Sequence, residues 1–456
     1  MRGVDSSLRW VHIVGVGGAG MSGLATLLVE SGVRVSGSDA VDSTVLHRLA
    51  AHGVEVRVGH DAVHGVGASV VTWSPAVGAD NPEVVGALAA GARALTRAEM
   101  LALLGEQRRI IGLTGTHGKT TATSMMVHVM AAARRDCARL LGADVIGVGQ
   151  NGHWGNDDLI LEVDESYGTF SLLRPHALGV LNIEADHLDH YGSLEALERA
   201  FAHLMERTTG PVVVWASDAG VASVCAGLAR PVVHVGTSPG AAWQVDLVHL
   251  ERTRSSFRLR HDHEELEVAL RVTGAHNVAN AAVVAVLALE VGVGADDIVA
   301  GLHEFAGAPR RFESRGSWRG VDVYEDYAHL PGEIAATIAG ARAAGYERVG
   351  VVFQPHRVTR TVNLLHDFAK SFGEVAHLAI TDVYHAGEPN PTGVTGERLV
   401  RAVAEYDPAV PVVYCQNLAD IANSIEPWHD ELDVLLFLGA GDVARAVATL
   451  RGGVVA

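Results

Sequence analysis

Short apolar runs alternate with amphipathic stretches and glycine-rich turns along most of the chain. Apolar runs of strand length lie at four places near the N-terminus: 10–14, 33–36, 54–58 and 69–74. A helical pattern at 21–31 separates the first two runs, another at 82–90 follows the fourth, and a similar alternation begins again after residue 321. Strands that alternate with helices are typical of a parallel sheet, so the pattern predicts an α/β fold.

A chain of 456 residues is too long for one hydrophobic core, and its length predicts about three domains. We place them at 1–107, 108–312 and 313–456. The first and third are expected to be Rossmann-like, and the central one to be a P-loop-type ATPase domain with a mostly parallel sheet. Three short runs within 243–273 predict a small antiparallel sheet in the central domain, with the polar cluster at 261–265 as a hairpin tip.

A glycine loop stands between a strand and a helix at the start of the central domain. The apolar run 110–113 leads into this loop, whose residues are Gly115, Thr116, His117, Gly118, Lys119, Thr120 and Thr121. Backbone N–H groups, a helix N-terminus and a lysine together favour phosphate, and a hydroxyl after the lysine is placed to bind Mg²⁺. Leu113 departs from the standard motif, and a glycine-rich turn with an exposed lysine is the alternative. The chain has only two lysines, Lys119 and Lys370, which favours a specific role for the first.

The first domain carries a complete G-x-G-x-x-G sequence directly after its first strand. Its glycines, including the one inside the motif, are Gly15, Gly17, Gly18 and Gly20. Asp39 follows at the end of the second strand, as a dinucleotide-binding βαβ unit requires, and Ser74 ends a later strand. The pattern predicts a diphosphate at the helix N-terminus. It fits a nicotinamide cofactor and a nucleotide sugar equally well.

Acids and histidines follow two further strands of the central domain. Glu165 follows the run 159–163, and His187 follows the run 178–182. Oxygen ligands behind a phosphate loop form a candidate Mg²⁺ site, although the residues around His187 can equally cap a helix. Further on, Asn277 and Asn280 lie in the first turn of a long apolar helix, where they can hydrogen-bond an adenine edge. Helix capping is the alternative role, and it would account for Asn277 but hardly for both Asn277 and Asn280.

Composition limits the partners. A formal net charge of −18 argues against nucleic acid and anionic membrane as partners. Three scattered cysteines form neither a disulfide framework nor a zinc pattern, and we find no signal sequence and no membrane-spanning run. We therefore expect a soluble cytoplasmic protein that is a monomer or a weak homodimer. In the third domain, Arg357 and Arg360 follow a strand and suit binding of carboxylate or phosphate.

These motifs together resemble the Mur ligase family over nearly the whole chain. The motifs are GVGGAGMSGLA from residue 15, TGTHGKTT from 114, EVDES from 162, NIEADHLDHY from 182, GAHNVAN from 274, EDYAHLPGEI from 325, FQPHRVTRT from 353 and HAGE from 385. The resemblance implies ATP-dependent amide formation between UDP-N-acetylmuramate and L-alanine, for peptidoglycan precursors. The first domain would hold the sugar nucleotide, the central one ATP with Mg²⁺, and the third would close over the site.

The resemblance also implies roles for single residues. Lys119 would bind the ATP phosphates, and the Mg²⁺ ligands would be Thr120, Glu165 and His187. The residues near adenine would be His276, Asn277 and Asn280, and those reaching ATP from the third domain Arg311 and Asp326. The sugar–alanine end would be lined by Tyr327, His329, Arg357 and Arg360. Of all these residues, Lys119, His187, His329 and Arg357 are predicted to be catalytic.

The chain departs from the family pattern at Leu330, where relatives have a second histidine, and around Tyr167. It also has no lysine between Lys119 and Lys370 that could be carbamoylated near the metal. Three alternatives stay open: a ligase that recycles a tripeptide onto UDP-N-acetylmuramate, a nicotinamide-dependent oxidoreductase, and a nucleotide-binding protein without catalysis.

Overall fold

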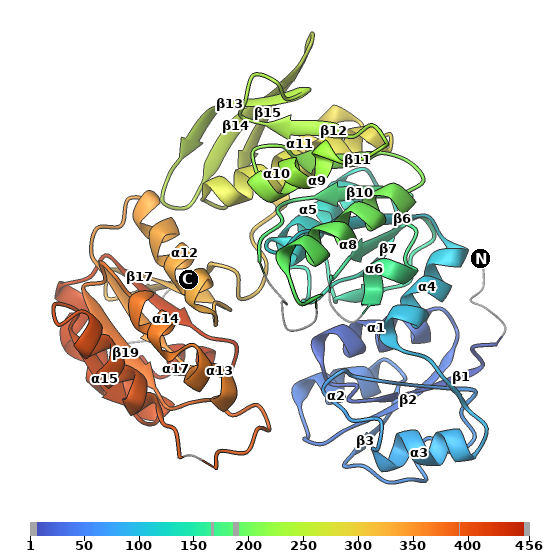
Figure 1. Ribbon diagram of the computed structural model, residues 1–456, viewed down its shortest axis with the longest axis horizontal. Coiled ribbons are helices and arrows are strands. Elements are labelled where there is room, and N and C mark those ends of the chain that lie inside the picture. Colours follow the sequence, from blue (N-terminus) through green and yellow to red (C-terminus); the bar gives the residue numbers. More distant parts are fainter. Residues whose placement is uncertain (1–6, 166–167, 186–190, 392, 451–456) are drawn as a thin grey trace. The chain divides into compact units, whose positions relative to one another are not determined.

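The computed structural model describes residues 7–165, 168–185, 191–391 and 393–450 (Figure 1). The described residues form three sheets of five, ten and six strands. Contacts divide the chain into two compact units, Met1–His249 with Ser255–Ala306, and Leu250–Arg254 with Gly307–Ala456. The first two sheets belong to the first unit and the third sheet to the second. The predicted α/β fold with three domains is confirmed.

The first sheet has the strand order β3-β2-β1-β4-β5, and every pair in it is parallel. Its strands are β1 Trp10–Val14, β2 Arg34–Asp39, β3 Glu55–Val58, β4 Val70–Trp73 and β5 Arg93–Ala94. Its helices are α1 Ala19–Glu30, α2 Thr44–Ala51, α3 Pro82–Ala89 and α4 Arg97–Gln107. β1 lies between β2 and β4, where the strand order reverses. The glycine loop after β1 therefore lies at the switch point where α/β sheets bind ligands.

In the ten-stranded sheet, β6 is an interior strand, and the phosphate loop follows it. β6 Ile110–Thr114 pairs in parallel with β9 Leu159–Glu162 on one side and β10 Ala177–Val180 on the other. The remaining strands are β7 Ala138–Leu140, β8 Gly152–His153, β11 Val212–Trp215, β12 Val233–Gly236, β13 Trp243–Leu250, β14 Ser255–His261 and β15 Glu264–Leu270. β14 and β15 are antiparallel, as predicted, and they continue the same sheet because β13 pairs with β12.

Helices cover both faces of this sheet. They are α5 Lys119–Ala132, α6 Thr169–Leu172, α8 Leu194–Arg207, α9 Ala219–Ala226, α10 Ala275–Glu290 and α11 Ala295–Glu304. α5, α10 and α11 pack on Ile111 and Leu113 of β6, while α8 packs in the cluster that contains Ile110. Every residue of β6 is buried, because strands of parallel sheets are covered on both faces.

The third sheet has the order β16-β17-β21-β18-β19-β20. Its strands are β16 Glu313–Trp318, β17 Val321–Asp326, β18 Val349–Phe353, β19 His377–Thr381, β20 Val412–Cys415 and β21 Val434–Leu438. Its helices are α12 Pro331–Ala343, α13 Val358–Asn363, α14 Leu365–Lys370, α15 Gly396–Tyr406, α16 Ile421–Ile425 and α17 Ala444–Val447. Five strands are parallel as predicted, but the edge strand β16 is antiparallel to β17 and was not predicted.

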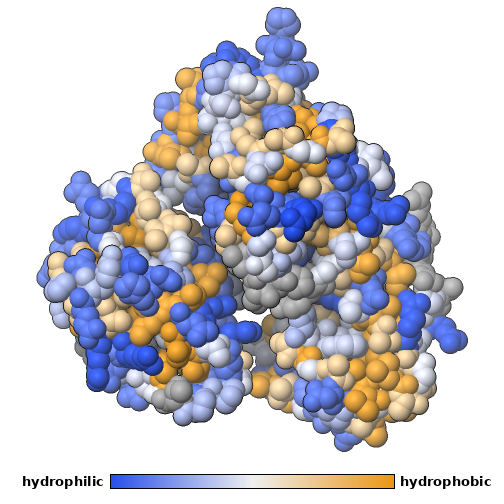
Figure 2. All heavy atoms as spheres, in the orientation of Figure 1, coloured by the Kyte–Doolittle hydropathy of each residue, from blue (hydrophilic) through white to orange (hydrophobic). Residues whose placement is uncertain are grey.

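The visible surface mixes polar and apolar side chains. Figure 2 shows hydrophilic atoms between orange areas, one of which covers the region where Figure 1 places α3. Two side chains of α3, Val85 and Leu88, are indeed exposed. Across the described ranges, no helix combines the length and the apolar character that crossing a bilayer requires.

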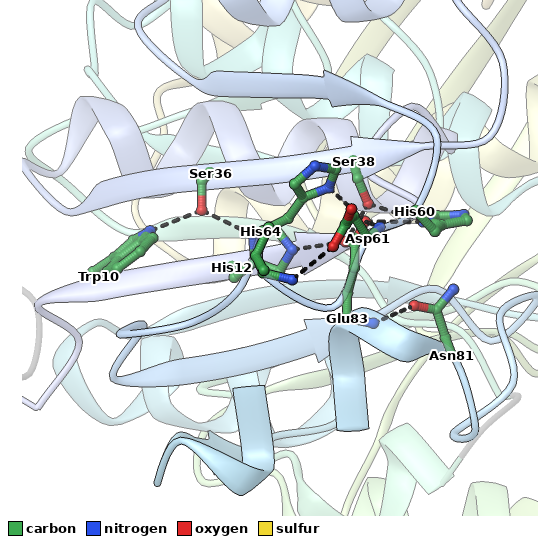
Figure 3. A network of polar contacts seen from close by, with 10 residues as sticks. Trp10, His12, Ser36, Ser38, His60, Asp61, His64, Asn81 and Glu83 are labelled. Atoms are coloured by element: carbon green, nitrogen blue, oxygen red, sulfur yellow. Dashed lines mark hydrogen bonds and ion pairs between the residues drawn. The ribbon is translucent and has the colours of Figure 1, made fainter. Parts of the chain in front are cut away.

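A buried carboxylate lies at the start of α3 in the first domain (Figure 3). Glu83 is completely buried and contacts three histidines, His12, His60 and His64, as well as the hydroxyl of Ser38. Burial alone would raise the pKa of Glu83, but the hydrogen bonds from His12, Ser38 and His64 outweigh it and hold the pKa at about 2. The ordinary value is 4.5.

This low pKa predicts a loss of stability in acid. Because the folded pKa is lower than the unfolded one, the carboxylate contributes stability that is present above pH 4.5 and is lost as the pH falls toward 2. Between pH 5 and pH 3 we expect the free energy of unfolding to fall by about 2 kcal/mol more in the wild type than in Glu83→Gln. Urea titrations of both proteins measure this difference, and parallel pH profiles would contradict it.

Candidate active site

The phosphate loop is held open by two glycines with positive φ angles. Gly115 has φ +149° and Gly118, which precedes α5, has φ +82°. A Cβ atom at Gly115 would lie 3.1 Å from the backbone nitrogen of Asn182, and one at Gly118 would lie 2.8 Å from Oδ1 of Asn280. Only glycine fits both the angles and the space. The predicted strand, glycine loop and helix are confirmed.

The loop is anchored to the segment that follows β10. Asn182 accepts the N–H of His117 on its side-chain oxygen at 2.7 Å and returns a bond from its amide to the carbonyl of His117 at 3.1 Å. The carbonyl of Asn182 accepts the N–H of Thr116 at 3.1 Å. The hydroxyl of Thr116 accepts the N–H of Glu184 at 2.8 Å. These bonds fix the loop from one side.

Lys119 and Glu165 form an ion pair on the other side of the loop. The ammonium lies 2.8 Å and 3.0 Å from the two carboxylate oxygens and also donates to the carbonyls of Gly115 and Thr116. The Glu165 side chain is 1% exposed and that of Lys119 is 14% exposed. Burial raises the pKa of Glu165, and the ammonium of Lys119 opposes that rise. The pair therefore keeps a cation and an anion together beside the glycines.

A second carboxylate orients the threonine that follows the lysine. Thr120 donates its hydroxyl to Glu162 at 3.0 Å, and the other oxygen of Glu162 accepts the N–H of Gly142 at 2.7 Å. Glu162 ends β9, so β9 supplies one carboxylate directly and a second, Glu165, three residues later. Two carboxylates and a hydroxyl beside a phosphate loop suit a hard cation such as Mg²⁺.

The other predicted metal ligand, His187, lies outside the described residues, as do Ser166 and Tyr167. Within the described part of the chain, no set of three or more histidine, cysteine or acidic side chains is arranged to hold a metal. That finding includes the polar cluster at 261–265, which forms the predicted hairpin turn. Glu162, Glu165 and Thr120 are the described residues that fit Mg²⁺ when a nucleotide supplies further oxygens.

The asparagines at the start of α10 differ in their surroundings. Asn277 donates to the carbonyl of Thr273 at 2.7 Å, which is a contact within the start of its own helix. Asn280 is buried and lies against Gly118 of the phosphate loop. The His276 ring lies beside Gly274. The structure thus brings Asn280 to the loop, while the adenine contacts predicted for the three residues remain predictions.

In the first domain the predicted residues converge on the glycine loop. Asp39 accepts the N–H of Gly17 at 3.0 Å. A Cβ atom at Gly15 would lie 2.9 Å from the Cβ of Ser74. Gly15 and Val16 donate their N–H groups to the carbonyl of Ser38. The ends of β1, β2 and β4 therefore meet, as expected for neighbouring parallel strands.

Arg97 was not predicted, but it lies at this loop. A Cβ atom at Gly20 would lie 3.0 Å from its Nε atom, so the guanidinium crosses the first turn of α1. The missing side chain of Gly20 thus leaves room for the guanidinium of Arg97 beside the N-terminus of α1. Both the helix N-terminus and the guanidinium favour binding of an anion there. Two other contacts were also missed, Glu162 with Thr120 and Asn182 with the loop. Glu162 is recognisable as the acid that ends an apolar strand, whereas nothing in the sequence pairs Arg97 with Gly20.

In the third domain, Asp326 holds the segment that carries Arg311. Its two carboxylate oxygens accept the N–H groups of Phe312 and Ala328, each at 2.7 Å. Burial raises the pKa of Asp326, and Arg311 opposes the rise. The guanidinium of Arg311 lies 5.2 Å from the ring centre of Tyr327. The predicted residues are therefore neighbours.

Beyond β17 and β18, histidines and arginines form a second group. Nδ1 of His329 lies 2.9 Å from the carbonyl of Tyr327, so it carries the proton and leaves Nε2 as the basic nitrogen. Arg360 donates to Nδ1 of His356 at 3.3 Å. Burial lowers the pKa of His329, and burial with nearby cations lowers that of His356 to about 4. Both rings are neutral at pH 7.

Arg357, at the start of α13, has an unusual backbone. Its φ angle is +71°, which is uncommon for a bulky side chain and marks a conformation fixed by its surroundings. Its N–H donates to the carbonyl of Tyr384, and its guanidinium lies 3.9 Å from Glu388. The side chain is thereby held at the carboxyl end of the sheet.

Three family models match the chain in sequence order. They are the Mur ligase family catalytic domain at 10–109, the Mur ligase middle domain at 113–288 and the glutamate ligase domain at 310–441. A relative from Myxococcus xanthus, UDP-N-acetylmuramate--L-alanine ligase, is 39% identical over 439 residues, which cover 95% of this chain and 93% of the relative. The chain belongs to the Mur ligase family. It is accordingly an ATP-dependent ligase that forms amide bonds.

Solved structures of other Mur ligases agree with this fold. UDP-N-acetylmuramate-alanine ligase MurC from Thermotoga maritima matches with a TM-score of 0.80 and 28% identity over 96% of both chains. The murein peptide ligase mpl from Psychrobacter arcticus matches with a TM-score of 0.72 and 23% identity over 98% of this chain and all of that one. The second likeness shows the fold alone.

The Lys119–Glu165 pair predicts a coupled effect on stability. In the wild-type background, Lys119→Ala leaves the buried carboxylate of Glu165 without its ammonium partner. In the Glu165→Gln background, the same change leaves no buried charge unpaired. We expect Lys119→Ala to cost about 2 kcal/mol more in the wild-type background than in the Glu165→Gln background. Urea denaturation without nucleotide measures the difference. Lys370→Ala, at an exposed lysine, is the matched control, and additive effects would show that the pair contributes nothing.

The Gly118 backbone predicts an effect on nucleotide affinity. Gly118→Ala combines a positive φ with contact between the new methyl group and Asn280, so the loop must move. We expect the Kd for ATP to rise at least tenfold, which corresponds to about 1.4 kcal/mol. Gly32→Ala is the control, because Gly32 has φ +90° with nothing within 4 Å. Equal effects of both changes on ATP titrations would refute the explanation.

Proposed function

We propose that this Mur ligase joins the amino group of L-alanine to the carboxylate of UDP-N-acetylmuramate with hydrolysis of ATP, in the synthesis of peptidoglycan precursors in the cytoplasm. The observation that carries the proposal is 39% identity over nearly full length to a relative with that activity in its name. The glycine loop with its lysine and two carboxylates supports the nucleotide part.

The chemistry proceeds in two steps. A carboxylate oxygen of the sugar nucleotide attacks the γ-phosphorus of ATP, which gives an acyl phosphate and ADP. The alanine nitrogen then attacks the acyl carbon, loses a proton, and expels inorganic phosphate. Negative charge grows on phosphoryl oxygens in the first step and on the acyl oxygen in the second, so fixed cations and exclusion of water accelerate both.

Lys119 and Glu165 suit this reaction because each can leave the other for a new partner when the nucleotide binds. When a triphosphate enters the loop, the ammonium of Lys119 can bind phosphate oxygens instead of the carboxylate of Glu165. Glu165 then becomes available to Mg²⁺ together with Thr120, which Glu162 already orients. Mg²⁺ would neutralise phosphate charge there. We retain His187 as a proposed ligand and the residues at 276–280 as proposed adenine neighbours.

The third domain would supply the residues for the amine. His329 is neutral and has its basic nitrogen at Nε2, so it can accept the proton that the alanine nitrogen loses. Arg311, Arg357 and Arg360 would contact phosphate or carboxylate groups. In the first domain, the glycine loop with Asp39 and Ser74 would hold the sugar nucleotide, with Arg97 beside its diphosphate.

Phosphate release tests the proposal. Purified protein with ATP, Mg²⁺ and UDP-N-acetylmuramate is given L-alanine, glycine, L-serine or the tripeptide L-Ala-D-Glu-diamino acid, beside a Lys119→Ala control. We expect release that requires the sugar nucleotide and L-alanine and falls at least a thousandfold in the control, because phosphate-binding cations contribute strongly to such transition states. Release only with the tripeptide would make the protein a recycling ligase. No phosphate release with any of these amines would overturn the proposal, and a change in nicotinamide absorbance after NADH or NADPH is added in a parallel assay would favour an oxidoreductase.

A further inference from the structure

Glu83 lies at the start of α3 in the first domain and joins separate segments of the chain through its buried carboxylate (Figure 3). Oε2 accepts Nε2–H of His12 at 2.8 Å and the hydroxyl of Ser38 at 2.5 Å. On the far side of the His12 ring, Nδ1 lies 2.8 Å from the hydroxyl of Ser36, which accepts the indole N–H of Trp10. Ser36 can thus donate to Nδ1, and this chain of bonds assigns the proton of His12 to Nε2.

The second oxygen of Glu83 holds the segment after β3. Oε1 lies 2.9 Å from Nδ1 of His64 and 3.2 Å from both Nδ1 of His60 and the N–H of Asp61. Glu83 is also in the first turn of α3, where Asn81 caps its N–H and the helix N-terminus favours an anion. The carboxylate therefore connects β1, the end of β2, the segment after β3, and α3.

Ser38 connects Glu83 to the glycine loop, because its hydroxyl bonds to Glu83 and its backbone bonds to the loop. Its carbonyl accepts the N–H groups of Gly15 at 2.8 Å and Val16 at 2.9 Å. The next residue, Asp39, accepts the N–H of Gly17. Three successive N–H groups of the loop are therefore held by the last two residues of β2. The hydroxyl of Ser38 in turn donates to Glu83 and lies 3.2 Å from Nδ1 of His60.

Glu83 and His12 cannot themselves contact a ligand, whereas His60 and His64 are partly exposed. The side chain of Glu83 is 0% exposed and that of His12 is 1% exposed, so neither reaches a substrate. Among the described residues, no three histidine, cysteine or acidic side chains are arranged to hold a metal ion, and this includes Glu83 with its histidines. Packing alone also does not require a carboxylate, because an apolar side chain would fill the space without desolvating a charge. A fully bonded polar cluster instead specifies one geometry.

We propose that Glu83 is a positioning residue for the sugar nucleotide: acting through the hydroxyl of Ser38, it fixes the end of β2 and thereby the glycine loop that receives the diphosphate. The identity of the ligand rests on the proposed function. The positioning itself rests on the contacts of Glu83, Ser38 and the loop.

Paired hydroxyl deletions on one strand test the proposal. Ser38→Ala removes the bond to Glu83 and the contact with His60, while Ser36→Ala removes a buried hydroxyl two residues earlier whose partners are Trp10 and His12. With the steady-state assay, we expect Ser38→Ala and Glu83→Gln each to raise the KM for UDP-N-acetylmuramate about tenfold, with kcat and the KM for ATP within about twofold. The double variant should be no worse than the worse single one. Ser36→Ala should leave the KM within about twofold.

Hydrogen exchange gives a second measurement that does not depend on the ligand. In the intact unliganded protein, we expect the amides of Gly15, Val16 and Gly17 to exchange about tenfold faster in Ser38→Ala and at the wild-type rate in Ser36→Ala. Unchanged exchange in Ser38→Ala, or equal changes in both variants, overturns the proposal. If the wild type does not turn over UDP-N-acetylmuramate, the proposed function fails, and the exchange rates alone decide whether Glu83 positions the loop.

Discussion

The carboxyl ends of parallel strands lie at one edge of their sheet, and this constraint gathers the candidate site residues within each domain. In the central sheet, β6 lies between β9 and β10, so the loop with Lys119 meets the acids after one neighbour and Asn182 after the other. In the first sheet, β1 lies between β2 and β4, so the glycine loop meets Asp39 and Ser74. The order of strands fixes these neighbours before any side chain does.

Buried charge is the second constraint, and each domain meets it with local partners. Glu165 is held beside the ammonium of Lys119, Glu83 among imidazoles and a hydroxyl, and Asp326 by two backbone N–H groups near Arg311. An isolated buried carboxylate would lower the free energy of unfolding by several kcal/mol. Each acid is therefore stable only in the position where its partners surround it. Each of these acids also holds a segment that carries a predicted ligand-binding residue. The polar clusters therefore set the shape of the loops, and they make the stability of the chain depend on keeping each buried acid with its partners.

The sequence predicted the elements whose signals are local. The strand, glycines and lysine around 110–119 follow one another directly, and their spacing alone identifies the loop. β16 was missed because its sequence, ESRGSW, has neither an apolar run nor strict alternation, and pairing with β17 makes it a strand. The predicted strand at 178–182 ends at Val180, because Asn182 bonds to His117 instead. Glu83 could not be identified, since it looks like an ordinary acid in a first helical turn and its partners lie 19 to 71 residues away.

The scarcity of lysine gives this chain an unusual reactivity toward electrophiles. An acylating reagent meets only two ε-amines, and they differ sharply: Lys370 is exposed, while Lys119 is 14% exposed and bonded to Glu165 and two carbonyls. Arginine, which supplies the other fixed cations, does not compete for such reagents because it stays protonated. Lys119 should therefore be modified slowly and Lys370 fast, and the rate at Lys370 serves as a reference for the rate at Lys119. Covalent labelling could report on the state of the phosphate loop through the ratio of the two rates, without an introduced cysteine or tag.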